Sequence, residues 1–208
     1  MTQTIQLEKI MKAINLQRHQ VLHPFKIVQA QSEHQIQQAF KKREYIPLDE
    51  GILWQIEVGV VRTLTLAEDG TIIPLGFWGV GEVIGQPLAC IQPYQIECLT
   101  NVKAIALRLD EFWDLHQVML SHIHQMQELF RVRHGLIQQR LLQFLEWLAN
   151  KFGFRADQGR LIPLRLTHQD LADVLGTTRV TITKSLQQLQ QQKIISLGKH
   201  QILLHDRP

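Results

Sequence analysis

The chain has 208 residues, of which 45% are hydrophobic and 20% are charged, and this composition is typical of a folded globular protein. No stretch reaches the roughly 20 apolar residues of a membrane-spanning helix, and residues 1–12 lack the apolar core of a secretory signal. We therefore expect no membrane association and a cytoplasmic location. The net charge is +3, and it becomes informative only when the two parts of the chain are counted separately.

The charge is distributed unevenly along the chain. Residues 1–130 carry 10 Lys and Arg against 14 Asp and Glu, a net of −4, whereas residues 131–208 carry 12 against 5, a net of +7. A basic half joined to an acidic half is typical of a protein with one nucleic-acid-binding end. The alternative is a solvated basic face that has no partner.

Residues 1–39 are polar and rich in glutamine, and we interpret them as an N-terminal extension that is helical in part. Residues 40–109 contain short β-type segments, and Asp69-Gly70 is a strong hairpin signal because glycine accepts a positive φ. Many short strands favour an antiparallel β-roll of the jelly-roll type. The expected strands are Arg43–Pro47, Leu53–Val58, Val60–Leu66, Thr71–Phe77, Tyr94–Leu99 and Ala104–Leu109.

Residues 110–138 have a helical period and are interpreted as a long dimerisation helix. Leu129, Val132 and Leu136 form one apolar stripe, and a second stripe gives the helix another apolar side to bury. We expect the second stripe to form a homodimer seam; the alternative is a core helix of one larger domain. The candidate dimer-interface residues are Met119, Ile123, Met126, Phe130 and Ile137.

Residues 139–208 have the order of a winged helix-turn-helix: a helix from about Gln139, a strand over 160–166, two short helices and a terminal hairpin. Thr167 can cap the first short helix, and Gly176 supplies the tight turn after it. Thr177 or Thr178 then caps the second short helix, which runs to about Gln191. The whole chain is therefore expected to be α+β, with a β-roll, a dimerisation helix and a winged helix-turn-helix.

The second short helix has the composition of a DNA recognition helix. Ile182, Leu186 and Leu189 share an inward side, so the opposite side faces solvent. Guanidinium, branched methyl, hydroxyl and ammonium groups on that side suit guanine, thymine and phosphates in a major groove. The candidate DNA-binding residues are Thr178, Arg179, Val180, Thr181, Thr183, Lys184 and Gln187 on this helix and Lys199 in the wing.

The span Leu166–His205 resembles the DNA-binding domain of the Crp/Fnr family of bacterial regulators. Arg179-Val180-Thr181-Ile182-Thr183-Lys184 is most similar to the recognition helix of the cyanobacterial nitrogen-control members, which carry Arg-Val-Thr-Val-Thr-Arg. The preceding segments follow the family's β-roll and dimer helix in order. The resemblance implies double-stranded DNA, a second copy of the chain and RNA polymerase as partners.

The resemblance of the sensor half to this family is more limited. Gly79–Gly85 resembles the turn at the β-roll pocket, but no arginine occurs between Arg62 and Arg108. By approximate alignment, Gln95 and Ile96 stand where cyclic-nucleotide-binding members place an Arg-Ser pair. A buried cyclic phosphate would have no guanidinium partner here, so cyclic AMP is not expected, and the effector stays unknown.

No nucleophile–base pair, phosphate loop or paired-carboxylate motif occurs, so we predict no enzymatic activity and no cofactor. The histidines at 116, 122 and 124 have poor spacing for a closed metal site, because helix positions two apart do not face each other. The predicted function is a homodimeric, sequence-specific DNA-binding regulator. The alternatives are a sensor or interaction module whose winged helix contacts protein, and a metal-responsive regulator.

Overall fold

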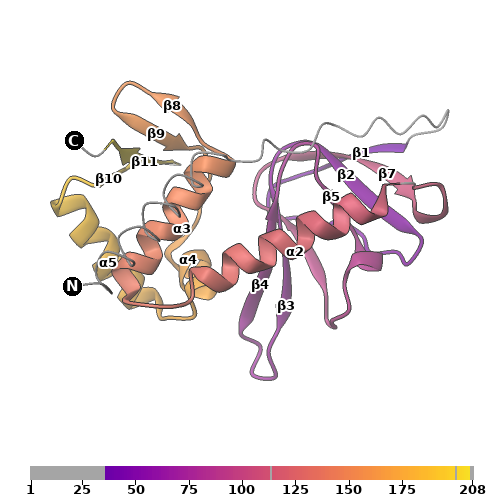
Figure 1. The fold of residues 1–208 in the computed structure, drawn as a ribbon, viewed down its shortest axis with the longest axis horizontal. Coiled ribbons are helices and arrows are strands. Elements are labelled where there is room, and N and C mark those ends of the chain that lie inside the picture. Colours follow the sequence, from indigo (N-terminus) through magenta and orange to yellow (C-terminus); the bar gives the residue numbers. More distant parts are fainter. Residues whose placement is uncertain (1–35, 113, 200, 207–208) are drawn as a thin grey trace, which may run out of the picture.

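A computed structural model describes residues 36–112, 114–199 and 201–206. The chain folds into a β-rich lobe and a mostly helical lobe, and helix α2 (Leu115–Arg131) runs along the first and ends at the second (Figure 1). This is the α+β arrangement expected from the sequence. The predicted extension over residues 1–39 lies outside the described residues, except for its last four, which belong to strand β1 (Ile36–Phe40).

The β-rich lobe is a β-roll of two antiparallel sheets. One sheet has the strand order β1-β7-β2-β5, and the other has the order β4-β3-β6. Five of the six predicted strands occur within two residues of their expected bounds. These five are β2 Ile52–Val58, β3 Val61–Leu66, β4 Ile72–Trp78, β6 Gln95–Cys98 and β7 Val102–Arg108. The two-residue strand β5, Val83–Ile84, was not predicted.

The predicted strand Arg43–Pro47 is wrong. The segment begins in a turn at Arg43, whose φ is +72°, and Tyr45 makes only an isolated antiparallel bridge to Glu97. The edge strand is instead β1, which pairs with β7. Four of the five β1 side chains are exposed, so this strand lacks the apolar alternation that predicts the others.

Aromatic and branched side chains fill the interior of the β-roll. Trp54, Trp78 and Tyr94 are at most 8% exposed and belong to one apolar cluster. The Trp78 Nε1–H donates to Thr63 Oγ1 at 3.0 Å, which satisfies the polar group of the indole inside the core. Burial raises the pKa of the Tyr94 hydroxyl, so this phenol stays neutral.

Helix α2 is shorter than the predicted dimerisation helix of residues 110–138. A 3-10 turn over Leu109–Glu111 precedes α2, and α2 ends at Arg131. The chain turns at Gly135, whose φ of +101° is a left-handed value that glycine adopts without strain. The next helix, α3 (Ile137–Lys151), is separate. The apolar period continues across this turn, which is why the sequence suggests one helix.

The helical lobe is the predicted winged helix-turn-helix. Its elements are α3, β8 (Phe154–Ala156), β9 (Gly159–Ile162), α4 (His168–Leu175), α5 (Arg179–Gln191), β10 (Ile195–Leu197) and β11 (Ile202–His205). The four strands form one antiparallel sheet of order β10-β11-β9-β8. Strand β9 is shorter than the predicted 160–166, and its partner β8 was not expected.

None of the helices in the described ranges has the length and apolarity to cross a bilayer.

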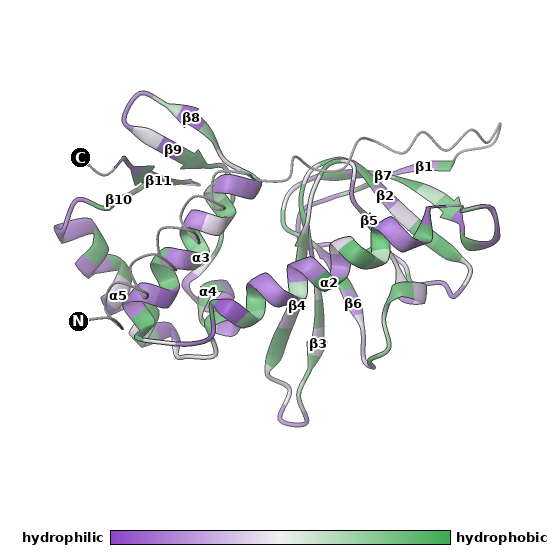
Figure 2. Ribbon diagram, in the orientation of Figure 1, coloured by the Kyte–Doolittle hydropathy of each residue, from purple (hydrophilic) through white to green (hydrophobic). Residues whose placement is uncertain are grey.

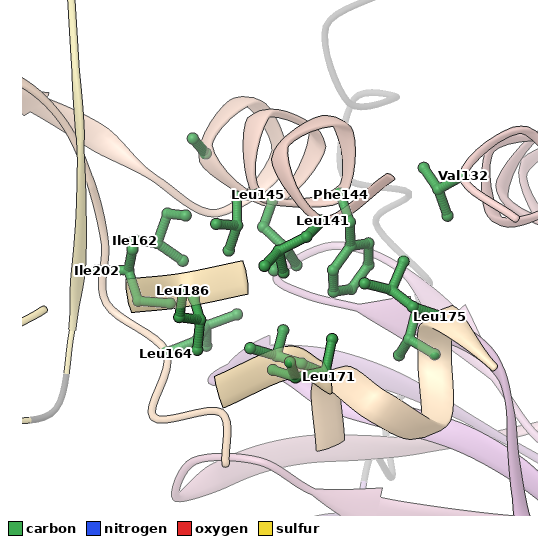
Figure 3. Packing of buried hydrophobic residues seen from close by; sticks show 14 of the residues in the cluster. Val132, Leu141, Phe144, Leu145, Ile162, Leu164, Leu171, Leu175, Leu186 and Ile202 are labelled. Carbon is green, nitrogen blue, oxygen red and sulfur yellow. The ribbon is translucent and has the colours of Figure 1, made fainter. Parts of the chain in front are cut away.

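The three helices of this lobe pack around a common apolar core. Figure 3 shows Leu141, Phe144 and Leu145 of α3 pointing toward Leu171 of α4 and Leu186 of α5. All five of these side chains are at most 2% exposed. The core therefore holds α4 and α5 in a fixed geometry, as ridge-and-groove packing of short helices requires.

The β-roll contributes to this same core. Val60, Phe77 and Leu99 belong to the apolar cluster of the helical lobe, and the Phe77 ring centroid lies 5.6 Å from that of Phe144 and 6.0 Å from that of Trp147. Aromatic rings at these separations attract each other beyond the effect of area burial. The two lobes are thus joined by a shared core and not only by a linker.

Phe77→Ala should lower the free energy of unfolding by about 3–5 kcal/mol, because it removes a fully buried aromatic ring and leaves a cavity. Urea unfolding monitored by circular dichroism measures this change. Phe154→Ala is the matched control, since Phe154 is 54% exposed, and we expect a change within about 0.5 kcal/mol. Equal effects of the two substitutions would show that Phe77 does not join the lobes.

Candidate DNA-binding interface

The first helix of the helix-turn-helix, α4, begins at a complete capping box. The Thr167 hydroxyl accepts from the Asp170 backbone N–H at 3.0 Å, and the Asp170 carboxylate accepts from the Thr167 backbone N–H at 2.7 Å. This satisfies two amide groups that a helix start leaves without partners. The helix ends at Gly176, whose φ of +57° gives the left-handed cap predicted for the turn.

The second helix, α5, begins after Thr178, which resolves the choice between two threonines. The Thr178 hydroxyl accepts from the Thr181 backbone N–H at 3.2 Å, as an N-cap does. Ile182, Leu186 and Leu189 are at most 2% exposed, and they form the inward side that the sequence predicts. The outward side of α5 is therefore determined by packing.

The candidate DNA-binding residues on α5 and at its N-cap lie away from the inward side, and Lys199 lies in the wing. Val180 is 63% exposed although it is apolar. Thr181 and Thr183 are half-buried, while the remaining candidates are exposed: Thr178, Arg179, Lys184, Gln187 and Lys199. A helix that keeps a guanidinium, an ammonium, an amide and a branched methyl in solvent has the groups needed to contact base edges and phosphates.

Thr183 makes an internal contact that the sequence analysis does not anticipate. Its hydroxyl donates to the Arg179 carbonyl oxygen at 2.9 Å, and His168 Nδ1 lies 2.8 Å from the same hydroxyl oxygen. Since the hydroxyl has a single hydrogen, the Nδ1–H of His168 must be the donor in this pair. His168, the first residue of α4, therefore links the two helices. The sequence offers no local signal for this contact, because the two residues lie fifteen positions apart.

The wing lies next to α5 in the chain and is tied to the rest of the lobe by its sheet. Strands β10 and β11 pair from Ile195↔Leu204 to Leu197↔Ile202, and β11 also pairs with β9. The predicted terminal hairpin therefore occurs. Lys199 is exposed in the connection between its strands.

The predicted dimer stripe on α2 is exposed in the single chain. Met119, Ile123, Met126 and Phe130 are 52%, 49%, 51% and 63% exposed, and Figure 2 shows hydrophobic and hydrophilic residues alternating along this helix. Their spacing of four, three and four residues is that of a coiled-coil seam. Ile137 does not continue this stripe, because it opens α3 and packs against the core of the helical lobe.

The other predicted stripe on this helix, Leu129, Val132 and Leu136, is only partly buried. Leu129 is 7% and Val132 is 1% exposed, whereas Leu136 is 72% exposed. Leu136 falls in the turn before α3, beyond the end of α2, so the helical period that predicts its burial no longer applies. The buried face of α2 is instead formed by Val118, Gln125 and Leu129.

The histidines of α2 have separate environments. The His122 ring stacks on Trp78 with centroids 4.0 Å apart, and its Nε2 lies 3.0 Å from the Val83 carbonyl oxygen. Burial lowers the pKa of His122, which favours the neutral ring. Within the described residues, no group of three or more His, Cys, Asp or Glu side chains could hold a metal ion.

Comparison with known proteins agrees with this geometry. The Crp-like helix-turn-helix domain family matches residues 139–208. The regulatory protein CysR of Synechococcus elongatus is 36% identical over 154 residues, which cover 72% of this chain and 74% of CysR. This chain belongs to the Crp/Fnr family. It is a DNA-binding transcription regulator and not an enzyme.

Three further similarities concern a curated relative and two solved structures. The global nitrogen regulator of a Synechocystis species is 34% identical over 110 residues, 50% of this chain and 49% of that protein. A CRP-family transcriptional regulator of Thermus thermophilus superposes with a TM-score of 0.70 at 24% identity, covering 81% of this chain and 92% of that one. FixK2 of Bradyrhizobium japonicum also reaches 0.70, at 19% identity and 84% and 94% coverage, which confirms the fold.

Thr178→Ala should lower the free energy of unfolding by about 1 kcal/mol, because the Thr181 backbone N–H loses its partner. Thr178→Ser keeps the hydroxyl and should restore most of this loss. Thermal unfolding of both variants measures the difference. An alanine variant as stable as the serine variant would mean that this hydroxyl does not cap α5.

Proposed function

We propose that this regulator binds a pseudo-palindromic operator as a homodimer, with one α5 in each of two successive major grooves. The observation that carries this proposal is the solvent-facing side of α5, where the exposed side chains of Arg179, Val180, Lys184 and Gln187 stand together. The amino end of α5, which begins after the N-cap Thr178, would direct its helix dipole toward phosphates.

Arg179 and Val180 are proposed to read bases. A guanidinium at the start of the helix can bond O6 and N7 of guanine, and the neighbouring valine can pack on a thymine methyl. By resemblance to the nitrogen-control regulators, the half-site would begin with GTA and its partner would end with TAC. Lys184, Gln187, Thr178 and Lys199 would contact mainly phosphates, which supply affinity more than discrimination.

The homodimer is proposed to form along α2. Four large apolar side chains exposed at coiled-coil spacing, Met119, Ile123, Met126 and Phe130, make a continuous patch for which solvent exposure is unfavourable. A second copy of the same helix offers the same patch, as a twofold interface requires. Leu120, 53% exposed beside Met119, would extend the seam beyond the residues that the sequence suggests.

Regulation by cyclic AMP is not part of this proposal. The β-roll interior is occupied by Trp54, Trp78 and Tyr94. Ile96, at a position that would face a cyclic phosphate by approximate alignment, is fully buried in the same cluster. A phosphate entering this apolar region would lose its hydration without a cationic partner. We propose that any effector of this regulator has different chemistry.

We further propose RNA polymerase as a partner and the cytoplasm as the location, since a transcription regulator acts where promoters are transcribed. The rival function is a winged helix that contacts another protein through Val180 and its neighbours. Binding that neutralises several phosphates weakens steeply as salt rises, whereas an apolar protein contact responds little. The salt dependence of operator binding therefore separates these two functions.

Arg179→Ala should weaken operator binding by about 1–3 kcal/mol and relax the preference at one position of each half-site. Lys184→Ala should weaken binding to all duplexes alike and reduce the salt slope by about one unit. Fluorescence anisotropy on duplexes in which the guanine is replaced measures both effects. If Arg179→Ala weakens every duplex equally, Arg179 only clamps phosphate and the half-site assignment fails.

Ile123→Asp should convert the dimer to monomer, because it places a charge in the centre of an apolar seam. Sedimentation velocity at micromolar protein measures the change. His124→Asp is the matched control on the solvent side of α2, where His124 is exposed, and it should leave the dimer intact. A dimer that persists in Ile123→Asp would remove the seam from this helix.

A further inference from the structure

Four charged side chains from distant parts of the chain meet in one cluster, which we call the ion cluster: Arg43, Arg62, Glu97 and Asp170. Arg62 Nε lies 2.7 Å from Glu97 Oε2, and Arg43 Nη1 lies 2.7 Å from Glu97 Oε1. Asp170 completes the ring, with Oδ2 3.0 Å from Arg43 Nη2 and Oδ1 3.1 Å from Arg62 Nη1. Each arginine therefore bridges both carboxylates.

The ion cluster crosses between the two lobes. Arg62 is on β3 and Glu97 is on β6 of the β-roll, and Arg43 is in the turn before them, whereas Asp170 is in the first turn of α4. Arg62, Glu97 and Asp170 are at most 4% exposed. Asp170 is also the residue that closes the capping box of α4, so its carboxylate connects the start of this helix to the β-roll.

The contacts within the ion cluster favour the ionised forms of Asp170 and Arg43. Burial alone would raise the pKa of Asp170, but hydrogen bonds from Arg43 and from the Thr167 backbone N–H outweigh it and hold that pKa below its usual value. The hydrogen bond to Asp170 raises the pKa of Arg43. Both groups are thus ionised at neutral pH, and the link persists across the physiological range.

The ion cluster is better suited to fixing an orientation than to adding stability. Desolvation of buried charges offsets much of their attraction, whereas loss of one partner leaves an uncompensated charge. The Nη1 atom of Arg62 illustrates this point, because it makes no hydrogen bond and is held near Asp170 by charge. Any rotation of α4 against the β-roll would separate these charges, so the cluster selects one orientation.

Two other contacts also fix the helical lobe against the β-roll. Lys151 Nζ, at the end of α3, lies 2.8 Å from Glu82 Oε1 of the β-roll. A Cβ atom placed on Gly79 would come within 2.9 Å of Phe152 Cε1, so the backbone of the β-roll directly contacts the helical lobe there. With the ion cluster at α4 and these contacts at α3, the helical lobe is held at separate points and cannot pivot about one of them.

The position of α4 is transmitted to the recognition helix. Leu171 and Leu186 pack in one core, and the His168–Thr183 hydrogen bond ties the first turn of α4 to α5. The docked orientation leaves Arg179 and Lys184 exposed. Helix α4 is fixed against the β-roll, and the β-roll is packed against α2. Helix α4 therefore sets the direction in which α5 points from the dimer seam.

We propose that Arg43, Arg62 and Glu97 are positioning residues for DNA binding: through Asp170 they set the angle of the recognition helix and hence the half-site spacing that the dimer accepts. This inference rests on the proposed homodimer. Two half-sites bind together only when the helices lie about one DNA turn apart. One inserted base pair moves a half-site by about 3.4 Å and rotates it by about 35°, so a rigid joint should reject it.

The test measures dissociation constants for the 208-residue chain on three duplexes: the proposed operator with GTA and TAC half-sites, the same operator with one base pair inserted at its centre, and a single half-site. The wild-type protein should bind the inserted operator at least about tenfold more weakly than the proposed operator. Arg43→Ala and Arg62→Met should reduce this spacing ratio at least about fivefold, while their affinity for the single half-site changes less than about twofold. A merely structural role would not change the ratio in this way.

One control and two contrary outcomes make the result decisive. Arg108→Ala removes the same charge from an exposed ion pair with Asp110 on the β-roll and should keep the wild-type ratio. Arg43 has a side chain that is 39% exposed, so Arg43→Ala decides the matter if Arg62→Met does not fold. A wild-type ratio in folded Arg43→Ala overturns the inference. A wild-type protein indifferent to spacing would instead remove the homodimeric operator binding on which it rests.

Discussion

Phe77 occupies the place where the β-roll, α2 and α3 meet, and the positions of the other parts depend on this contact. Its backbone N–H donates to the Gln125 side-chain oxygen of α2 at 2.6 Å, while its ring packs against Phe144 and Trp147 of α3. A strand residue is thus bonded to one helix and packed against the next. Because α3 carries α4 and α5 on its other side, the position of the recognition helix depends on β4.

Asp170 shows how a local signal acquires a long-range role. Its first role is to close the capping box of α4, which any isolated helix could use. The same carboxylate also faces Arg43 and Arg62 from the β-roll. The first turn of the helix-turn-helix therefore cannot form its cap in the docked lobe without also meeting the sensor half, and folding of the motif and placement of the lobe become coupled.

The winged helix-turn-helix was predictable because its signals are local. Thr167, Gly176 and Thr178 mark helix ends by their own chemistry, and the apolar period of α5 selects its outward side. The other strands of the β-roll follow from their apolar patterns, with the exceptions of exposed β1 and the two-residue β5. The break at Gly135 is hidden because the apolar period continues across it, and this is why Ile137 was assigned to the wrong helix.

The ion cluster was beyond the reach of sequence reasoning for a different reason. Its members stand at positions 43, 62, 97 and 170, and no local rule relates charges so far apart in the chain. Arg62 has the pattern of an ordinary polar residue on a strand, and the absence of arginines after it is informative only about a phosphate site. His168 is similar, since its partner Thr183 is fifteen residues away on the other helix.

The contact of Gly79 with Phe152 bears on how such regulators exchange parts. A transplanted DNA-binding unit joined at the turn around Gly135 would bring a foreign residue to the position of Phe152, whose ring lies where a Cβ atom on Gly79 would stand. The β-roll that received this unit would also place Phe77 and Arg62 against different residues of the new helical lobe. The smallest interchangeable module in this chain therefore includes the β-roll face together with the lobe it touches, so recombination at the linker alone would separate residues that function as a unit.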